Sequence, residues 1–432
     1  MNLIGKSQVS AIRRFGSLGL EAKLLLSTQL LFNVGFYLVV PFLAAYMTED
    51  LALGGALVGF IIGLRTFSQQ GMFFVGGALA DRFGIKPVLL TGIVIRILGF
   101  LATGLMTSVA GFMLGVVLIG FGAALFSPAV ESRLAQLEPA ERGDLSRPEL
   151  FSLDTLFLNI GSLVGPVLGA LLIPFGFRLV SLLGAGIFGC IFLGHAFLVR
   201  GGEVKRAESL TAGMSSAVRN RMFIAFALTS CMGQVAYHMQ YQAIPVELQR
   251  TGLPELVMGW IFAGISVYFV TAQMSINAWA ERRPVREALA VGFGVQAIGF
   301  VIMAVAAVCP PLPGAWALLP IAVWLLIMHF GQMVSYPSSK DLVGIIAGEK
   351  NLGTYFGVYN SFGGFAVMVV SIGVGRVFDF ATVTNPWAFL PWACLAALLA
   401  AAAMGVARVA GAVSNRLAED TEQDPQQESA HL

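Results

Sequence analysis

The stretch Gly77-Ala-Leu-Ala-Asp81-Arg82-Phe-Gly84-Ile85-Lys86-Pro87 decides the fold, because it is a short polar break between two long apolar segments. Residues 55–80 precede it and residues 87–107 follow it, and each segment exceeds the roughly 18 residues that a helix needs to cross a membrane. The two glycines permit tight turns, the aspartate can face a helix N-terminus, and the arginine can pair with a carboxylate on a neighbouring helix. The stretch therefore predicts a membrane-spanning hairpin whose polar turn can hold one conformation.

The composition extends this prediction to the whole chain. Of 432 residues, 57% are hydrophobic and 12% are charged, and the mean hydropathy is +0.81, which is outside the range of a soluble domain. We expect an all-α membrane protein with twelve transmembrane helices. Their predicted ranges are 24–47, 55–80, 87–107, 110–130, 151–173, 179–199, 222–246, 256–280, 285–308, 315–337, 354–377 and 386–408.

The chain contains an internal repeat. A shift of 200 residues aligns Ala80-Asp81-Arg82 with Ala280-Glu281-Arg282, and Gly99-Phe100 with Gly299-Phe300. A shift of 209 residues aligns the segment from Gly122 to Pro128 with the one from Gly331 to Pro337. Parallel six-helix repeats related by an axis along the membrane normal bind cargo near the midplane between them. We therefore expect two pseudo-symmetric six-helix halves.

These repeats and the polar segments define the predicted domains. Residues 1–200 form the N-terminal half, 201–221 a central cytoplasmic loop and 222–408 the C-terminal half. Residues 409–432 form a polar cytoplasmic tail, and from Ser414 onward its lack of apolar periodicity predicts disorder.

The basic residues predict the topology. With the N-terminus inside, 21 of the 26 Lys and Arg residues are cytoplasmic and only Arg178, Arg250 and Arg376 lie outside. This asymmetry places both termini in the cytoplasm of a multi-pass cell inner membrane protein. The first 20 residues lack the apolar region of a cleavable signal peptide, so the first helix is expected to direct insertion.

The polar turn at residues 77–87 resembles the signature loop of the major facilitator superfamily, with Ile85 where Arg or Lys is common. The resemblance implies the major facilitator fold and a conformational latch at this loop. In that family an acid at the position of Glu131 often pairs with the arginine at the position of Arg82. The implied latch residues, including the second copy of the loop, are Gly77, Asp81, Arg82, Gly84, Lys86, Glu131, Glu281 and Arg282.

The fifth predicted helix carries Gly161-Ser-Leu-Val-Gly165-Pro166-Val-Leu-Gly169-Ala170, which resembles the antiporter motif of the same family, with Ala170 in place of a last glycine. The resemblance implies export by antiport, as in the drug:proton antiporter branch. One feature departs from that branch, because Val116 stands where an arginine is frequent. A plain reading of the glycines as helix packing remains open.

The second and third predicted helices are most similar to the multidrug resistance protein MdtH group. The residues that carry this resemblance run from Gly63 to Gly71 and from Ile95 to Phe100. It implies small-molecule cargo and a proton as the coupling ion, with no other cofactor.

Two arginines and one aspartate lie well inside predicted spans, where each costs about 2.5–3.5 kcal/mol on insertion scales and marks a pathway or a partner. Arg65 and Arg96 fall near the midplane, and Asp154 is the only acid that lies a full turn inside a predicted span. We predict that Asp154 is the proton-coupling site and that the arginines favour cargo with a carboxylate. The alternatives are a helix-start carboxylate for Asp154, and backbone hydrogen bonds or snorkelling for the arginines.

Polar residues at spacings of three and four in the seventh helix predict a stripe that faces a cavity. Together with the two arginines they form the predicted cargo-binding set: Arg65, Gln69, Arg96, Gln234, Tyr237, His238 and Tyr241. The intramembrane histidines lack metal-ligand spacing, and no phosphate-binding loop, catalytic triad or zinc pattern occurs in the sequence. We expect neither a metal site nor an enzyme.

The sequence thus predicts a proton-coupled exporter of small amphipathic drugs or metabolites that works by alternating access. Its expected partners are the cargo and membrane lipid, with no nucleic acid and no obligate protein partner. Two alternatives remain: a transporter for uptake or export of one specific metabolite, and a non-transporting membrane receptor on the same fold.

Overall fold

The computed structural model describes residues 15–135, 137, 139–143, 147–198, 216–347 and 352–423, and their regular elements are all helices. The first half contains η1 (Phe15–Ser17), α2 (Leu20–Val39), η2 (Val40–Phe42), α3 (Leu43–Glu49), α4 (Gly55–Gln70), α5 (Phe73–Phe83), α6 (Ile85–Leu105), α7 (Val109–Ala135), α8 (Pro139–Arg142), α9 (Arg147–Leu172), η3 (Ile173–Phe175) and α10 (Phe177–Leu198). The second half contains α12 (Arg221–Thr251), α13 (Leu256–Ala280), α14 (Val285–Val308), η4 (Gly314–Leu318), α15 (Leu319–Ala347), α16 (Leu352–Phe378), η5 (Asp379–Ala381) and α17 (Leu390–Gln423).

The second predicted span is divided into two helices. In the described part of the chain, eleven helices are long and apolar enough to cross a membrane, and α4 followed by α5 supplies the twelfth crossing. The break lies at Gly71 and Met72. The Ser361 hydroxyl of α16 donates a hydrogen bond to the Gly71 carbonyl over 3.0 Å, so a side chain from the other half satisfies a backbone acceptor at the break.

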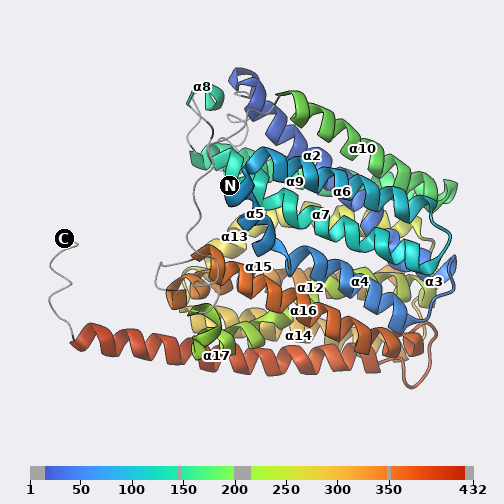
Figure 1. Cartoon of the computed structure of the whole chain (residues 1–432). Coiled ribbons are helices and arrows are strands. Elements are labelled where there is room, and N and C mark those ends of the chain that lie inside the picture. Colours follow the sequence, from blue (N-terminus) through green and yellow to red (C-terminus); the bar gives the residue numbers. More distant parts are fainter. Residues whose placement is uncertain are drawn as a thin grey trace.

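The helices form two bundles that lie side by side (Figure 1). α2 begins and α17 ends at the same end of the molecule, on the left of the view, and we name it the terminal end. The opposite end, where α3 and α12 finish, is named the far end. The bundles meet along two seams, one between α4 and α16 and the other between α9 and α13.

Glycines allow the first seam to be close. A Cβ on Gly63 would lie 2.6 Å from the Met368 Cα, and a Cβ on Gly59 would collide with the Ser371 carbonyl oxygen. Small residues let transmembrane helices approach closely where lipid gives no hydrophobic drive for association. The α4–α16 seam therefore depends on glycine at these two positions.

The two halves repeat one helix crossing. In the first half, a Cβ on Gly92 of α6 would lie 2.9 Å from the Gly122 carbonyl oxygen of α7. In the second half, a Cβ on Gly292 of α14 would lie 2.9 Å from the Gly331 carbonyl oxygen of α15. The aligned glycines of the sequence repeat therefore occupy equivalent packing positions.

The predicted tail needs a correction. α17 continues as helix to Gln423, whereas the sequence predicted the last span to end at 408 and disorder from Ser414. The segment contains Arg416, Leu417, Ala418 and Glu419, which are strong helix formers and can extend a helix that packing has already nucleated. Most of the predicted central loop lies outside the described residues.

Candidate functional site

Arg65 lies where the two halves meet, on α4. Its side chain is 1% exposed, its Nη1 donates to the Gln69 Oε1 over 3.0 Å, and its Nη2 lies 3.4 Å from the Thr66 Oγ1. Its Nε has no hydrogen-bond partner among the residues that the structure describes. The guanidinium also stands 5.4 Å from the centre of the Phe36 ring. The cation is thus buried with an incomplete set of hydrogen bonds among the described residues.

Three tyrosines from both halves surround this charge. The Tyr37 hydroxyl of α2 and the Tyr237 hydroxyl of α12 are 3.4 Å apart, and the rings of Tyr237 and Tyr241 are 6.3 Å apart. All three tyrosines interact electrostatically with Arg65. The predicted residues Arg65, Gln69, Tyr237 and Tyr241 are therefore brought together, and Tyr37 joins them. Tyr37 was not among the predicted residues, although Gln29 and Asn33 precede it at intervals of four and could have indicated a polar face on this helix.

Other polar groups of the predicted α12 stripe are engaged within the second half. The His238 Nδ1 lies 2.9 Å from the Gln234 carbonyl oxygen, one turn earlier. Gln234 packs on α16, where a Cβ on Gly363 would collide with its side chain. His329 of α15 lies 3.2 Å from the Gln240 Oε1. No group of three or more potential metal ligands occurs in the described residues.

Arg96 has a different environment from Arg65. Its side chain is completely buried inside the first half, where its guanidinium stands 4.1 Å from the Phe32 ring centre and 4.6 Å from that of Phe188. The rings belong to α2 and α10, and α7 approaches through Gly122. The elements that enclose Arg96 all belong to the first half, so the structure separates the two arginines that the sequence grouped together.

Asp154 is buried in α9, with 9% of its surface exposed, about two turns from the terminal end of that helix. The expectation that it is the only acid inside a span was wrong. Glu247 is fully buried within α12, and Glu21 is buried at the start of α2. Both lie just outside the predicted spans 222–246 and 24–47.

Both missed acids are paired with arginines. The Arg133 Nε donates to the Glu21 Oε1 over 2.6 Å and its Nη2 to Oε2 over 2.8 Å, which ties α7 to α2 at the terminal end. At the far end Arg250 forms an ion pair with Glu247 and donates to the Cys309 carbonyl and the Thr384 hydroxyl, each over 3.2 Å. The first pair links two helices of the first half, and Arg250 links α12 to Cys309 and Thr384 of the second half.

The terminal-end loop forms a tight turn between α5 and α6. Gly84 adopts φ +89°, which favours glycine. Lys86 donates to the Ala196 carbonyl of α10 over 3.1 Å, and Arg82 is exposed and lies over its neighbour Phe83. In the second copy of the loop, Glu281 and Arg282 are both exposed. The side chains of Asp81 and Glu131 lie outside the described residues, so the pair between Arg82 and Glu131 stays a prediction.

The glycines of the antiporter-like motif face α2. A Cβ on Gly161 would lie 2.5 Å from the Leu30 carbonyl oxygen, and one on Gly165 would lie 2.8 Å from the Tyr37 Cβ. A Cβ on Gly169 would lie 2.5 Å from the Leu38 carbonyl oxygen. On the other face of α9, the Pro166 carbonyl oxygen lies 2.6 Å from a Cβ built on Gly259 of α13. The motif therefore packs α9 between α2 and the second half.

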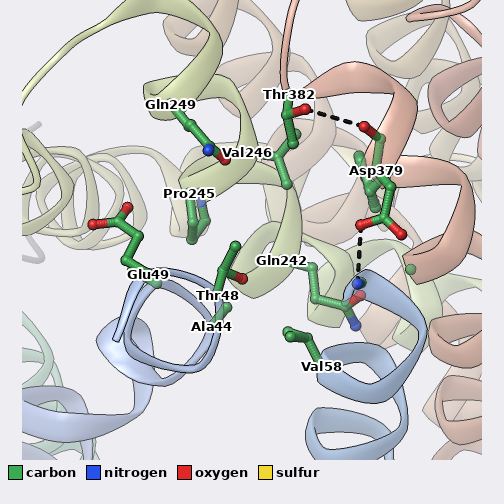
Figure 2. Close-up of a pocket in the computed structure, with 14 residues that line it drawn as sticks. Ala44, Thr48, Glu49, Val58, Gln242, Pro245, Val246, Gln249, Asp379 and Thr382 are labelled. Carbon is green, nitrogen blue, oxygen red and sulfur yellow. Dashed lines mark hydrogen bonds between the residues drawn. The ribbon is translucent and has the colours of Figure 1, made fainter. Parts of the chain in front are cut away.

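A small pocket of about 30 Å³ lies at the far end between the halves (Figure 2). The Asp379 carboxylate, at the start of η5 directly after α16, accepts a hydrogen bond of 2.9 Å from the Gly55 amide at the start of α4. Gly54, the N-cap residue, has no side chain with which to do so. A carboxylate at a helix N-terminus is stabilising, so this contact links α4 to the segment after α16 at the far end of the seam.

Comparisons with known proteins agree with this architecture. The chain matches the Major Facilitator Superfamily model over residues 25–371. It is 31% identical to an uncharacterized MFS-type transporter of Mycobacterium tuberculosis, over 84% of this chain and 87% of the relative. It is 28% identical to multidrug resistance protein MdtH of Photorhabdus laumondii, over 77% of this chain and 80% of the relative.

Solved structures of transporters share the fold. The POT family transporter PepTSo superposes with a TM-score of 0.76 at 12% identity, covering 91% of this chain and 98% of that one. The nucleoside transporter NupG superposes with a TM-score of 0.71 at 15% identity, covering 90% and 99%. The predicted resemblance to the family and to the MdtH group is confirmed, as are the helical membrane fold and the expectation of a transporter rather than an enzyme. This multi-pass membrane protein belongs to the major facilitator superfamily of transporters.

Proposed function

We propose that this transporter exports small amphipathic compounds across the bacterial inner membrane in exchange for protons, with the terminal end in the cytoplasm. The excess of Lys and Arg in the segments at the terminal end supports this orientation. The similarity to MdtH proteins supports multidrug cargo, and the antiporter-like motif in α9 supports exchange. Asp154 is the proposed proton site.

The observation that carries the cargo assignment is Arg65 between the halves. A guanidinium presents a planar fork of donors that suits a carboxylate, and one Arg65 donor has no partner in the described structure. The Phe36 ring centre lies 5.4 Å from the guanidinium, and Tyr37 and Tyr237 interact with it electrostatically. We infer that the cargo carries a carboxylate and an apolar ring system, as zwitterionic drugs do.

Flux into proteoliposomes tests this proposal with a matched pair of compounds, a fluorescent zwitterion and its methyl ester. The wild-type protein should transport the acid better than the ester. Arg65→Gln should lower kcat/KM for the acid by about 10- to 100-fold, which corresponds to the loss of a charge-assisted hydrogen bond, and should change the ester little. An equal loss for both compounds would assign Arg65 a packing role and would remove the carboxylate from the proposal.

A further inference from the structure

Arg96 is enclosed on every side that the structure describes. Four phenyl rings surround its guanidinium, with ring centres at 4.1 Å for Phe32, 4.6 Å for Phe188, 5.6 Å for Phe36 and 5.8 Å for Phe100. Its three nitrogens have no hydrogen-bond partner among the described residues. A Cβ on Gly122 would lie 2.9 Å from the Arg96 Cβ, so α7 packs closely against the base of this side chain. Cargo at the seam cannot reach this guanidinium while the ring cage is intact.

The second half shows that the fold does not need a cation here. Gln296 is the counterpart of Arg96, and it donates to the Gly292 carbonyl over 3.3 Å and to the Ser335 hydroxyl over 3.1 Å. The counterpart of Ser335 in the first half is Phe126, which stacks on Phe32 with ring centres 4.7 Å apart. One half therefore fills this position with a neutral hydrogen-bonded pair and the other with a cation among rings. The difference points to a role beyond packing.

Phe36 connects Arg96 to the seam. The Arg65 guanidinium stands 5.4 Å from the centre of this ring, and the Arg96 guanidinium stands 5.6 Å from it. Tyr37 follows in the chain and contacts Phe36 edge-to-face at 4.9 Å. The face of an aromatic ring attracts cations, so contact with both guanidiniums restricts the orientation of the Phe36 ring.

We propose that Arg96 is a positioning residue for cargo recognition: it holds Phe36, and through Phe36 it sets the orientation of Arg65 and Tyr37, without touching the cargo. This inference rests on the proposed function, because it assigns the recognition of the carboxylate to Arg65 alone. It replaces the expectation that both arginines bind cargo.

One test does not depend on cargo. 4-Fluorophenylalanine is placed at Phe36 in the purified full-length protein, and its ¹⁹F NMR signal is recorded. We expect a single narrow signal in the wild type, a similar one in Arg96→Lys, and a shifted or divided signal in Arg96→Gln. An Arg96→Gln signal identical to that of the wild type would overturn the inference whatever the cargo is.

The second test measures binding of the zwitterion and its methyl ester by titration calorimetry. Arg96→Gln should weaken binding of the acid about fivefold relative to binding of the ester, and Phe36→Leu should do the same. When either substitution is added to Arg65→Gln, the ratio of acid affinity to ester affinity should not change further. An additional loss in the Arg65→Gln background would identify Arg96 as a direct cargo contact and overturn the inference.

The matched control is Gln296→Leu, which disrupts the equivalent position of the second half. It should lower the melting temperature but leave the acid-to-ester ratio unchanged. If Arg96→Gln behaves in this same way, its role is structural and the inference is wrong. If the wild-type protein does not distinguish acid from ester, the proposed function fails, and the ¹⁹F signal still decides the role of Arg96.

Discussion

At the scale of single residues, the structure distinguishes charges that look alike in sequence. Arg65 and Arg96 each interrupt a nearly uniform apolar span, so their cost in a membrane was predictable and their surroundings were not. Only packing shows that Arg65 meets tyrosines of the second half while Arg96 is enclosed by phenyl rings of its own half. Glu247 was missed because a charge one residue beyond a predicted span reads as a helix end.

The buried pair of Glu247 and Arg250 gives a prediction about stability. Glu247→Ala leaves the Arg250 guanidinium buried without its carboxylate, and breaking such a pair costs about 3–5 kcal/mol. We expect a clear fall in melting temperature in detergent. The exposed Glu281→Ala is the control and should melt as the wild type does. Equal melting temperatures for Glu247→Ala and the wild type would show that the pair contributes nothing to stability.

Glu255, just before α13 at the far end, gives a prediction about pH. Partial burial, and then repulsion from Glu49 and Asp50, raise the pKa of this carboxyl from its ordinary 4.5 to about 7. Between these values the folded state holds the proton more tightly than the unfolded state, so stability falls as pH rises from about 4.5 to 7. The melting temperature should therefore fall over this window, and less steeply in Glu255→Gln. The same slope in both proteins would contradict this assignment.

At the scale of helices, the apolar segments predicted the approximate positions of eleven spans. For the twelfth they predicted the crossing but not its division into α4 and α5. The break at Gly71 could not be predicted, because glycine is common inside transmembrane helices and the Ser361 hydroxyl that supports the break comes from the other half. The seam glycines of α4 were visible in sequence, yet nothing there showed which helix they face.

The α4–α16 seam gives a prediction about conformation. Gly59→Val places a side chain against the Ser371 carbonyl and should push the far ends of the two helices apart. A cysteine at Gln242, which lines the far-end pocket, should then react faster with a membrane-impermeant maleimide in a protein without its native cysteines. Gly186→Val is the control, because a Cβ there meets no neighbour within 4 Å. Unchanged reactivity in Gly59→Val would show that the seam does not control access.

The loop between α5 and α6 gives a prediction about transport rate. Asp81→Asn and Arg82→Ala each remove one proposed latch residue and no proposed cargo contact, so kcat for transport should fall several-fold while the Kd for cargo stays constant. Stopped-flow flux and equilibrium binding on the same preparations measure the two quantities. Wild-type rates in both variants would exclude the latch.

At the scale of the whole molecule, two similar bundles carry unequal chemistry. The repeat predicted the halves and their equivalent crossings at Gly122 and Gly331, but the charged residues break the symmetry. Arg65 and Asp154 are on the first half, and the tyrosines of α12 meet Arg65 across the seam. In the proposed function, rocking of one half against the other changes the surroundings of the proposed cargo and proton sites together. Proton-driven export requires this coupling.

Accumulation of the zwitterion in proteoliposomes with an acidic interior tests the central claim most directly. The wild-type protein should concentrate the compound inside above its external level, a protonophore should abolish the accumulation, and protein-free liposomes should show none. Asp154→Asn should exchange the compound down its gradient at a measurable rate and never accumulate it, because an amide cannot carry a proton. A wild-type protein that ignores the pH gradient, or an Asp154→Asn variant that accumulates the compound as the wild type does, would contradict the account.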